Sequence, residues 1–230
     1  MAREKTSVSQ EDYLKAIWEQ VQEEQVPIAA RLAEDLDVTP PAVAAALKRM
    51  ARSGYLRVVR EGRIQLSAKG RAAAQHLVLR HRLAEKLLTE VIGLEWSSAH
   101  EEAERLEHGM SPEVVKLLLA RFGRDSFCPH GVPLFGGLSK LRRQQGAIRL
   151  SDAASEGEVQ VLRVYERDPH FLEFLAGHGL KPGTRVRVMG RQYDETMTLS
   201  LAGKSSAKIY LGKPATQRIW VRQISQRVNH

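Results

Sequence analysis

The chain has 230 residues, a single cysteine and a formal charge of +8 at pH 7. This length is enough for two or three small domains with cores of their own, and the absence of any run of 18 apolar residues excludes a spanning helix. Because Cys128 has no partner for an internal disulfide, we expect a protein of the reducing cytoplasm.

The charges fall into a basic block followed by an acidic block. Residues 48–71 hold eight Lys or Arg against Glu61 alone, whereas residues 85–113 hold eight Glu against Lys86 and Arg105. A basic block favours phosphates and an acidic block favours cations. The sequence therefore predicts two different binding surfaces on neighbouring parts of the chain.

The N-terminal third reads as helices followed by a hairpin. Helices are predicted over residues 9–22, 28–37 and 39–54, and strands over residues 55–60 and 63–66. Ser9 and Thr39 are the expected caps, and Glu61–Gly62 is the expected hairpin turn. Three helices and a basic hairpin predict a winged helix-turn-helix.

The third of these helices separates into a core side and a DNA side. Its predicted core residues are Val43, Ala46, Leu47 and Met50. The residues expected to contact DNA are Thr39, Pro41, Ala42, Ala45, Lys48, Arg49, Arg52 and Arg60. Arg57 and Arg63 also suit a wing that follows the phosphate backbone. Small side chains offer few hydrogen bonds, so DNA shape and phosphate contacts should carry much of the affinity. The alternative is a basic surface on an unrelated three-helix domain.

The middle of the chain is predicted to be helical and the C-terminal part to be β. Helices are expected over residues 68–92, 98–109 and 111–122, a connector over residues 123–146, and a further helix over residues 169–176. Strands are expected over residues 159–164, 185–189, 196–201, 208–211 and 218–222. The middle helices have apolar surface left over, which favours a dimer interface. The five short strands predict a small barrel of the SH3 type.

One face of the short helix carries ligand-type side chains. His100, Glu104, Glu107 and His108 follow at i, i+4, i+7 and i+8, which places them on the same side. Two imidazoles and two carboxylates suit a divalent cation better than a core, although a solvated acidic helix is the common alternative.

Two further pairs add to this pattern. His81 and Glu85 stand four residues apart on the long helix, so they project together from a neighbouring element. Cys128 and His130 stand two apart in the connector, where both could reach one ion. A buried cysteine beside an exposed histidine is the alternative for that pair.

Three stretches resemble the diphtheria toxin repressor family of metal-dependent transcriptional regulators, and in particular its manganese-responsive branch. They are residues 11–17 (EDYLKAI), 80–88 (RHRLAEKLL) and 100–111 (HEEAERLEHGMS). Residues 158–230, with Leu175 and the stretch 179–183 (GLKPG), resemble the SH3-like, FeoA-type domain of longer members. The likeness covers nearly the whole chain and implies a repressor, not an enzyme, with a metal ion as corepressor.

The resemblance implies two metal sites. The first would consist of Asp12, Glu104, Glu107 and His108, with His81 nearby. The second would consist of Glu85, Cys128, His130 and Asp168. His100 matches an ancillary-site ligand of iron-type members and is a candidate for either site. Asp12 has a competing interpretation as a helix-capping residue.

The metal expected from this comparison is Mn²⁺. Iron-type members carry Met where Asp12 stands and Cys where Glu104 stands, and carboxylate oxygens in place of sulfur suit Mn²⁺. Fe²⁺ is the alternative, and Co²⁺, Zn²⁺ or Cd²⁺ are expected to bind in vitro. Ala45 stands where the iron-type repressor has Gln, so the operator of that repressor is not carried over.

The fold class expected is α+β in three domains. These are a winged helix-turn-helix over residues 1–74, a helical dimerisation and metal-binding domain with its connector over residues 75–145, and an SH3-like domain over residues 146–230. The expected partners are double-stranded DNA with a palindromic operator and a second copy of the chain, with no membrane and no small organic substrate.

Three alternatives remain at this point. One is a winged-helix regulator that responds to a small organic ligand and that metal does not control. Another is a dinuclear metalloenzyme, against which stands the lack of a Glu-x-x-His pair among the candidate ligands. A third, for residues 158–230 alone, is a module that binds proline-rich peptides, although its aromatic content is low.

Overall fold

The computed structural model describes residues 10–201 and 208–224, and the expected cap Ser9 lies outside them. The chain forms two compact units, Met1–Arg80 and His81–His230. Among the described residues, no helix has both the length and the apolar character needed to cross a membrane.

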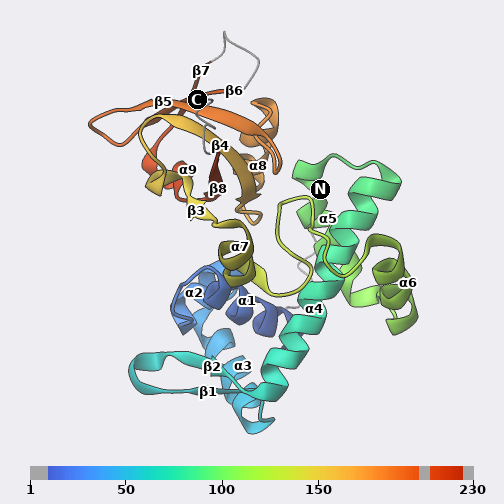
Figure 1. Ribbon diagram of the computed structural model, residues 1–230. Helices are drawn as coiled ribbons and strands as arrows, with labels where there is room; N and C mark the ends of the chain where they lie inside the picture. Colours follow the sequence, from blue (N-terminus) through green and yellow to red (C-terminus); the bar gives the residue numbers. More distant parts are fainter. Residues whose placement is uncertain (1–9, 202–207, 225–230) are drawn as a thin grey trace, which may run out of the picture. The chain divides into compact units, whose positions relative to one another are not determined.

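The first unit is the expected winged helix-turn-helix (Figure 1). It consists of α1 (Gln10–Gln22), α2 (Ala29–Asp35), α3 (Pro40–Arg52), β1 (Leu56–Val58), β2 (Ile64–Leu66) and the start of α4 (Ala68–Leu87). Leu14, Ile17, Leu32, Val43 and Met50 are almost fully buried and form the centre of its core. Apolar side chains at helical spacing on α1 and α3 thus meet around Leu32.

The wing, residues 56–66, is an antiparallel hairpin in which Leu56 pairs with Leu66 and Val58 with Ile64. Each strand is shorter than expected because residues 60–62 form a 3-10 turn. Glu61 and Gly62 both have positive φ, 60° and 70°, as the predicted turn requires. Thr39 is the residue before α3, but its side chain makes no capping hydrogen bond.

The second unit begins with helices. They are the end of α4, a π-helical turn (Leu88–Ile92), a 3-10 turn (Trp96–Ser98), α5 (Ala99–Leu106), a 3-10 turn (Glu107–Gly109), α6 (Pro112–Phe122) and α7 (Gly137–Gln145). The long helix therefore changes to a wider turn after Leu87, and Gly93 at φ 81° ends it. Ser111 caps α6, since its hydroxyl accepts from Val114 N at 3.3 Å.

Helix α7 corrects the prediction of a helix-free connector. It is bounded by Gly136 and Gly146, both left-handed, and only Leu138 and Leu141 of its apolar residues are buried. Two apolar positions in nine residues are too few for a periodic signal.

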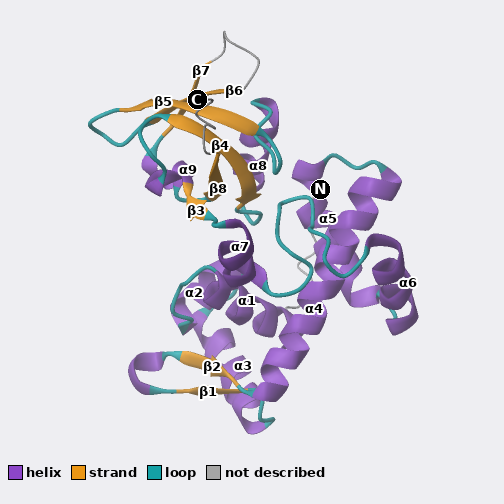
Figure 2. Cartoon of the chain, in the orientation of Figure 1, coloured by secondary structure: helices purple, strands orange, loops and turns teal. Residues whose placement is uncertain are grey.

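The rest of the second unit is a six-stranded antiparallel sheet, shown in orange in Figure 2. Its strands are β3 (Ile148–Arg149), β4 (Gly157–Val164), β5 (Arg185–Arg191), β6 (Met197–Leu201), β7 (Lys208–Leu211) and β8 (Ile219–Ile224), in the order β3-β8-β4-β5-β6-β7. The helices α8 (Pro169–Gly177) and α9 (Lys213–Thr216) accompany it. The short β3 and α9 were not predicted, while the other five strands and α8 were.

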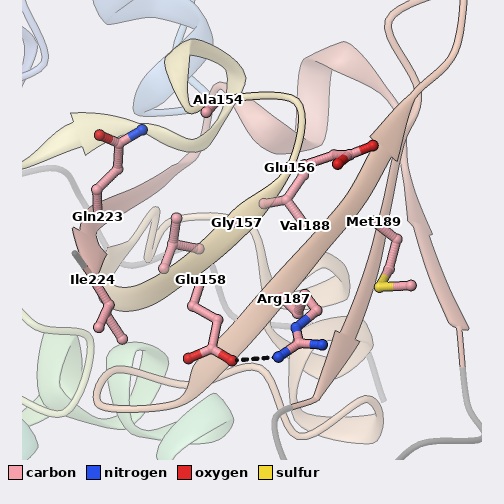
Figure 3. A pocket seen from close by; sticks show the side chains of 10 residues that line it. Ala154, Glu156, Gly157, Glu158, Arg187, Val188, Met189, Gln223 and Ile224 are labelled. Carbon is pink, nitrogen blue, oxygen red and sulfur yellow. Dashed lines mark hydrogen bonds and ion pairs between the residues drawn. The ribbon is translucent and has the colours of Figure 1, made fainter. Parts of the chain in front are cut away.

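The sheet core follows from strict alternation along the strands. On β5, Val186 and Val188 are buried while Arg185, Arg187 and Met189 face solvent. A hollow of about 660 Å³ opens where β4 begins. Figure 3 shows Glu158 and Arg187 facing each other there, and their ion pair measures 2.9 Å. Glu156 also lines this hollow, so the one cation among the described residues that line it is already paired with one of the two carboxylates.

Candidate metal centre and DNA-binding surface

Glu85 lies at the centre of a cluster of three histidines. Its side chain, on the last turn of α4, is fully buried. Oε1 lies 3.0 Å from His81 Nε2, 3.3 Å from His100 Nδ1 and 3.0 Å from His130 Nδ1. The four side chains come from α4, α5 and the connector, so the fold of the second unit brings them together.

A group of four buried residues shares this carboxylate. We call Glu85, Cys128, His130 and Glu166 the buried ligand group. Each offers one ligand atom, and these atoms all lie within 4.8 Å of one another. Carboxylate, thiolate and imidazole in one dry site are ligands of first-row divalent metals.

The connector is shaped to present Cys128 and His130 on the same side. Gly131 N donates to Cys128 O at 2.9 Å, which closes a turn around Pro129, and Val164 N donates to His130 O at 3.0 Å. Gly131 has a φ of 85°, and a Cβ there would lie 1.9 Å from Leu162 O. Only glycine therefore allows the connector to lie against β4.

The donor set of the buried ligand group fits a cation. His130 Nε2 donates to Trp96 O at 3.1 Å, so Nδ1 is the ring nitrogen that faces Glu85 Oε1 and that would bind a metal ion once deprotonated. A lone pair and a carboxylate oxygen at 3.0 Å repel each other unless a proton or a metal ion lies at hand. Glu85 Oε2 and Glu166 Oε2 are buried and accept no hydrogen bond from the described residues. Buried oxygens without such a partner are suited to bind a metal ion.

The electrostatics of the group agree with this. Burial alone would raise the pKa of Glu85, but the charges of His130 and His81 outweigh it and hold that pKa well below its usual range. Burial would likewise lower the pKa of His130, but the Glu85 carboxylate raises it. The pKa of Cys128 is raised well above its usual value by burial and by Glu85. Metal binding there would have to displace the thiol proton.

The pKa of Glu166 is also lowered. Burial and the Glu85 carboxylate act to raise it, while the charges of His130 and Arg163 lower it further. Both carboxyl groups of the buried ligand group are therefore held as carboxylates, the form that binds metal.

His81 joins the buried ligand group to the predicted face of the short helix. Its Nδ1 lies 2.6 Å from Glu107 Oε2, and its Nε2 lies 2.9 Å from His100 Nδ1. His100 is thus placed with His81 and Glu85. Glu107 is buried beside His81, on the opposite side of the ring from Glu85.

The predicted ligand face is divided by burial. His100 and Glu107 are buried, whereas 53% of the Glu104 side chain and 37% of the His108 side chain are exposed. The reason is local, because α5 ends at Leu106 and the chain tightens into a 3-10 turn over residues 107–109. We call Glu104 and His108 the exposed pair. Asp12, the remaining residue of that predicted set, lies half-buried in the first turn of α1, on the first unit.

Asp168 stands where a helix begins and outside the buried ligand group. Its Oδ1 accepts from Phe171 N at 3.1 Å as the N-cap of α8, and its Oδ2 pairs with Arg218 at 2.7 Å. The buried ligand group contains Glu166, two residues earlier, in addition to Glu85, and the sequence analysis did not identify Glu166. Asp168-Pro169 has the pattern of an N-cap followed by proline at the first helical position. That pattern assigns Asp168 to the helix and leaves Glu166 as the acidic residue of this loop that could bind a metal ion.

The DNA side of the first unit is exposed as predicted. All eight expected contact residues, from Thr39 to Arg60, are accessible to solvent, while the core side of α3 is buried. On the wing, Arg57 Nε donates to Gln65 Oε1 at 3.1 Å, which holds the guanidinium along the hairpin.

Comparison with known proteins decides the family. The DNA-binding domain of iron-dependent repressors matches residues 5–63, their metal-binding and dimerisation domain matches residues 67–136, and the FeoA domain matches residues 148–223. The chain belongs to the iron-dependent repressor family. The iron-dependent repressor IdeR of Mycobacterium tuberculosis H37Rv is 42% identical over 189 residues, covering 77% of this chain and 82% of its own. The diphtheria toxin repressor of Corynebacterium diphtheriae is 33% identical over 203 residues, covering 84% and 89%.

Solved structures agree with the assignment of this repressor. A manganese-dependent transcriptional repressor in complex with manganese is 30% identical, with a TM-score of 0.82, and covers 94% of this chain and 100% of its own. ScaR with bound Zn²⁺ is 28% identical, with a TM-score of 0.78 and the same coverage. The predicted fold and class of function are confirmed: the chain is a metal-dependent DNA-binding transcriptional repressor, not an enzyme.

Proposed function

We propose that Mn²⁺ activates this repressor for binding to operators of metal-uptake genes in the cytoplasm, with Fe²⁺ as the competing ion. The observation that carries metal binding is the buried ligand group, in which His130 Nδ1 faces Glu85 Oε1 at 3.0 Å. The preference for Mn²⁺ follows from the number of oxygen ligands. Carboxylates make up two of the four buried ligands and three of the four ligands in the other proposed set.

Two sets of residues would hold the ions. Glu85, Cys128, His130 and Glu166 form the first set, within the second unit. Asp12, Glu104, Glu107 and His108 form the second set, which draws on both units. A bound divalent ion supplies positive charge that offsets the repulsion between these carboxylates.

Asp12 would couple metal binding at the second set to DNA binding. It belongs to the helix that opens the DNA-binding unit, while Glu104, Glu107 and His108 belong to the other unit. An arrangement in which all four converge is stabilised by metal and disfavoured without it. Fixing that arrangement would set the position of α3 relative to DNA, where small errors of angle cost binding.

A second copy of the chain completes the proposal. Apolar side chains of the helical part remain exposed, namely Val91 (47%), Ile92 (65%), Leu106 (39%), Val114 (40%) and Leu117 (60%). Exposed apolar surface of this kind is typical of a protein interface. A two-fold dimer would present two recognition helices to a palindromic operator.

Fluorescence anisotropy of labelled promoter fragments tests the proposal. Chelated protein should bind weakly, and added Mn²⁺ should restore tight binding at a lower concentration than anaerobic Fe²⁺. Arg49→Ala is a useful control, because it should weaken binding without changing the metal response. Equal binding with and without chelator would contradict metal control, and a lower effective concentration of Fe²⁺ would contradict the choice of Mn²⁺.

A further inference from the structure

An apolar hollow of about 380 Å³ lies behind the wing, entirely within the first unit. It is lined by the end of α1, the segment after it, both strands of the wing and the start of α4. The lining residues on which the inference depends are Trp18, Val21, Val26, Arg57, Arg63 and Arg71. This volume lies within the range of small-molecule sites, roughly 300–1,000 Å³.

Trp18, Val21 and Val26 form the apolar part of the lining. Val21 and Val26 line the hollow together with Trp18, and 48% and 46% of their surfaces are exposed. The hollow therefore presents apolar surface to water. The segment that carries Val26 is fixed on both sides. Ile64 N donates to Pro27 O at 2.9 Å, and Arg31 donates to Val26 O at 2.6 Å.

The lining also has a cationic part. Arg57, Arg63 and Arg71 line the hollow, and no Asp or Glu occurs among the described residues that do so. Arg57 donates one bond to Gln65, and Arg71 donates one to Leu66 O at 2.9 Å. Each guanidinium has five N–H donors, so these bonds orient the groups while leaving donors for a ligand. Arg63 shares an exposed ion pair with Glu61 at 3.4 Å, a weak interaction in water.

We propose that this hollow binds a small organic anion with a flat apolar body and one carboxylate. The apolar part of the lining explains the apolar body, because burial of a ring against Trp18, Val21 and Val26 removes apolar surface from water. The cationic part explains the carboxylate, which guanidinium groups bind with paired charge-assisted hydrogen bonds. A bare phosphate would leave the apolar part uncovered, and a neutral ring would offer no negative charge to the three guanidinium groups.

Binding at this hollow opposes operator binding, a consequence that rests on the proposed function. Arg57 and Arg63 stand on the wing, where they would follow the phosphate backbone. A carboxylate bound to them competes with DNA phosphates for the same donors. The organic anion is therefore an effector that acts against the metal ion, and it is not a substrate.

Calorimetric titration of the full chain with 1-naphthoate and with 1-naphthamide, a neutral molecule of similar shape, tests the site. Naphthoate should bind roughly tenfold tighter than naphthamide, the usual size of one charge-assisted contact. Arg71→Gln should remove most of that difference and leave naphthamide binding unchanged. Lys69→Gln, the loss of a nearby cation that does not line the hollow, should change neither. Equal affinity for the two probes, or naphthoate binding unaffected by Arg71→Gln, would overturn the proposal.

Operator binding by the metal-loaded protein tests the competition separately. Naphthoate at saturation should lower operator affinity several-fold in the wild type and far less in Arg71→Gln, because Arg71 is not among the predicted DNA contacts. Naphthoate binding without any change in operator affinity would overturn the competition. If operator binding itself were absent, the proposed function would fail, and the calorimetry would still decide the hollow.

Discussion

The buried ligand group and the exposed pair belong to the same unit but differ in how they are completed. Glu85, Cys128, His130 and Glu166 are all buried, and their ligand atoms already lie within 4.8 Å of one another. Glu104 and His108 are exposed at the end of α5, and their proposed partner Asp12 belongs to the other unit. A group complete within one unit suits stable binding, whereas a group that needs a second unit suits a switch.

The largest effect is expected when the carboxylate at the centre of the buried ligand group is removed. Glu85→Gln keeps the volume but takes away the charge that three imidazoles share. We expect Mn²⁺ affinity of the buried ligand group to fall by more than about 100-fold, since even outer-shell changes cost about 10–100-fold. Isothermal titration calorimetry measures this, with the exposed Glu113→Gln as control. Wild-type Mn²⁺ affinity in Glu85→Gln would show that the buried ligand group does not bind this ion.

Asp12→Ala tests whether the other set couples metal to DNA. Metal-dependent operator affinity should fall roughly 5–150-fold, the usual range of coupling between sites. The neighbouring Glu11→Ala removes a carboxylate from the same turn and should have little effect, since Glu11 is an exposed partner of Arg80 at 3.8 Å. Full metal-dependent binding by Asp12→Ala would make Asp12 a helix cap and nothing more.

Cys128→Ser tests how much the thiolate contributes to the preference between metal ions. Replacing sulfur with oxygen should lower the affinity for Zn²⁺ about tenfold or more and change that for Mn²⁺ much less, because thiolate favours the softer ion. Competition titrations with the two metals compare wild type and variant directly. An equal loss for both ions would show that the thiol contributes by its position in the core and not by its softness.

Unfolding of the chelated protein should depend on pH in two directions. The pKa of Glu85 is lowered below 4.5, so its stabilisation is present above that unfolded value and lost as pH falls through the folded one. The pKa of His130 is raised above 6.5, so its stabilisation is complete below 6.5 and lost as pH rises through the raised value. Denaturant unfolding across the pH range should show highest stability between these limits. His130→Gln should flatten the alkaline side, and an unchanged alkaline side in that variant would contradict the assignment.

The smallest effect is expected at Asp168. Asp168→Ala removes the cap of α8 and the exposed pair with Arg218, which should cost about 1 kcal/mol of unfolding free energy. Mn²⁺ affinity should not change. Glu166→Gln should show the reverse, with weakened metal binding. If Asp168→Ala lost metal affinity instead, Asp168 and not Glu166 would be the ligand.

The structure also shows which features of the fold the sequence could predict. Helical spacing on α1 and α3 and alternation on β5 report burial directly, so the winged helix and most strands were predictable. Helix α7 was not, because Leu138 and Leu141 alone give no period, and its bounds depend on two left-handed glycines.

The candidate site divides in the same way. His81 and Glu85 were placed together by their spacing on one helix. The family resemblance implied that Glu85, Cys128 and His130 share a site, but it named Asp168 and not Glu166. Their convergence depends on Gly131 lying against β4, a tertiary contact that no local pattern records. The uneven exposure of Glu104 and Glu107 likewise depends on where α5 tightens into a 3-10 turn.

Counting bound Mn²⁺ by electron paramagnetic resonance would show whether the chain holds two separate metal sites. We expect two ions per chain in the wild type. We expect one in Asp12→Ala, held by the buried ligand group, and one in Glu85→Gln, held by the set that includes Asp12. A single ion in the wild type, or two ions retained in both variants, would contradict the division between a site complete within one unit and a site that needs both.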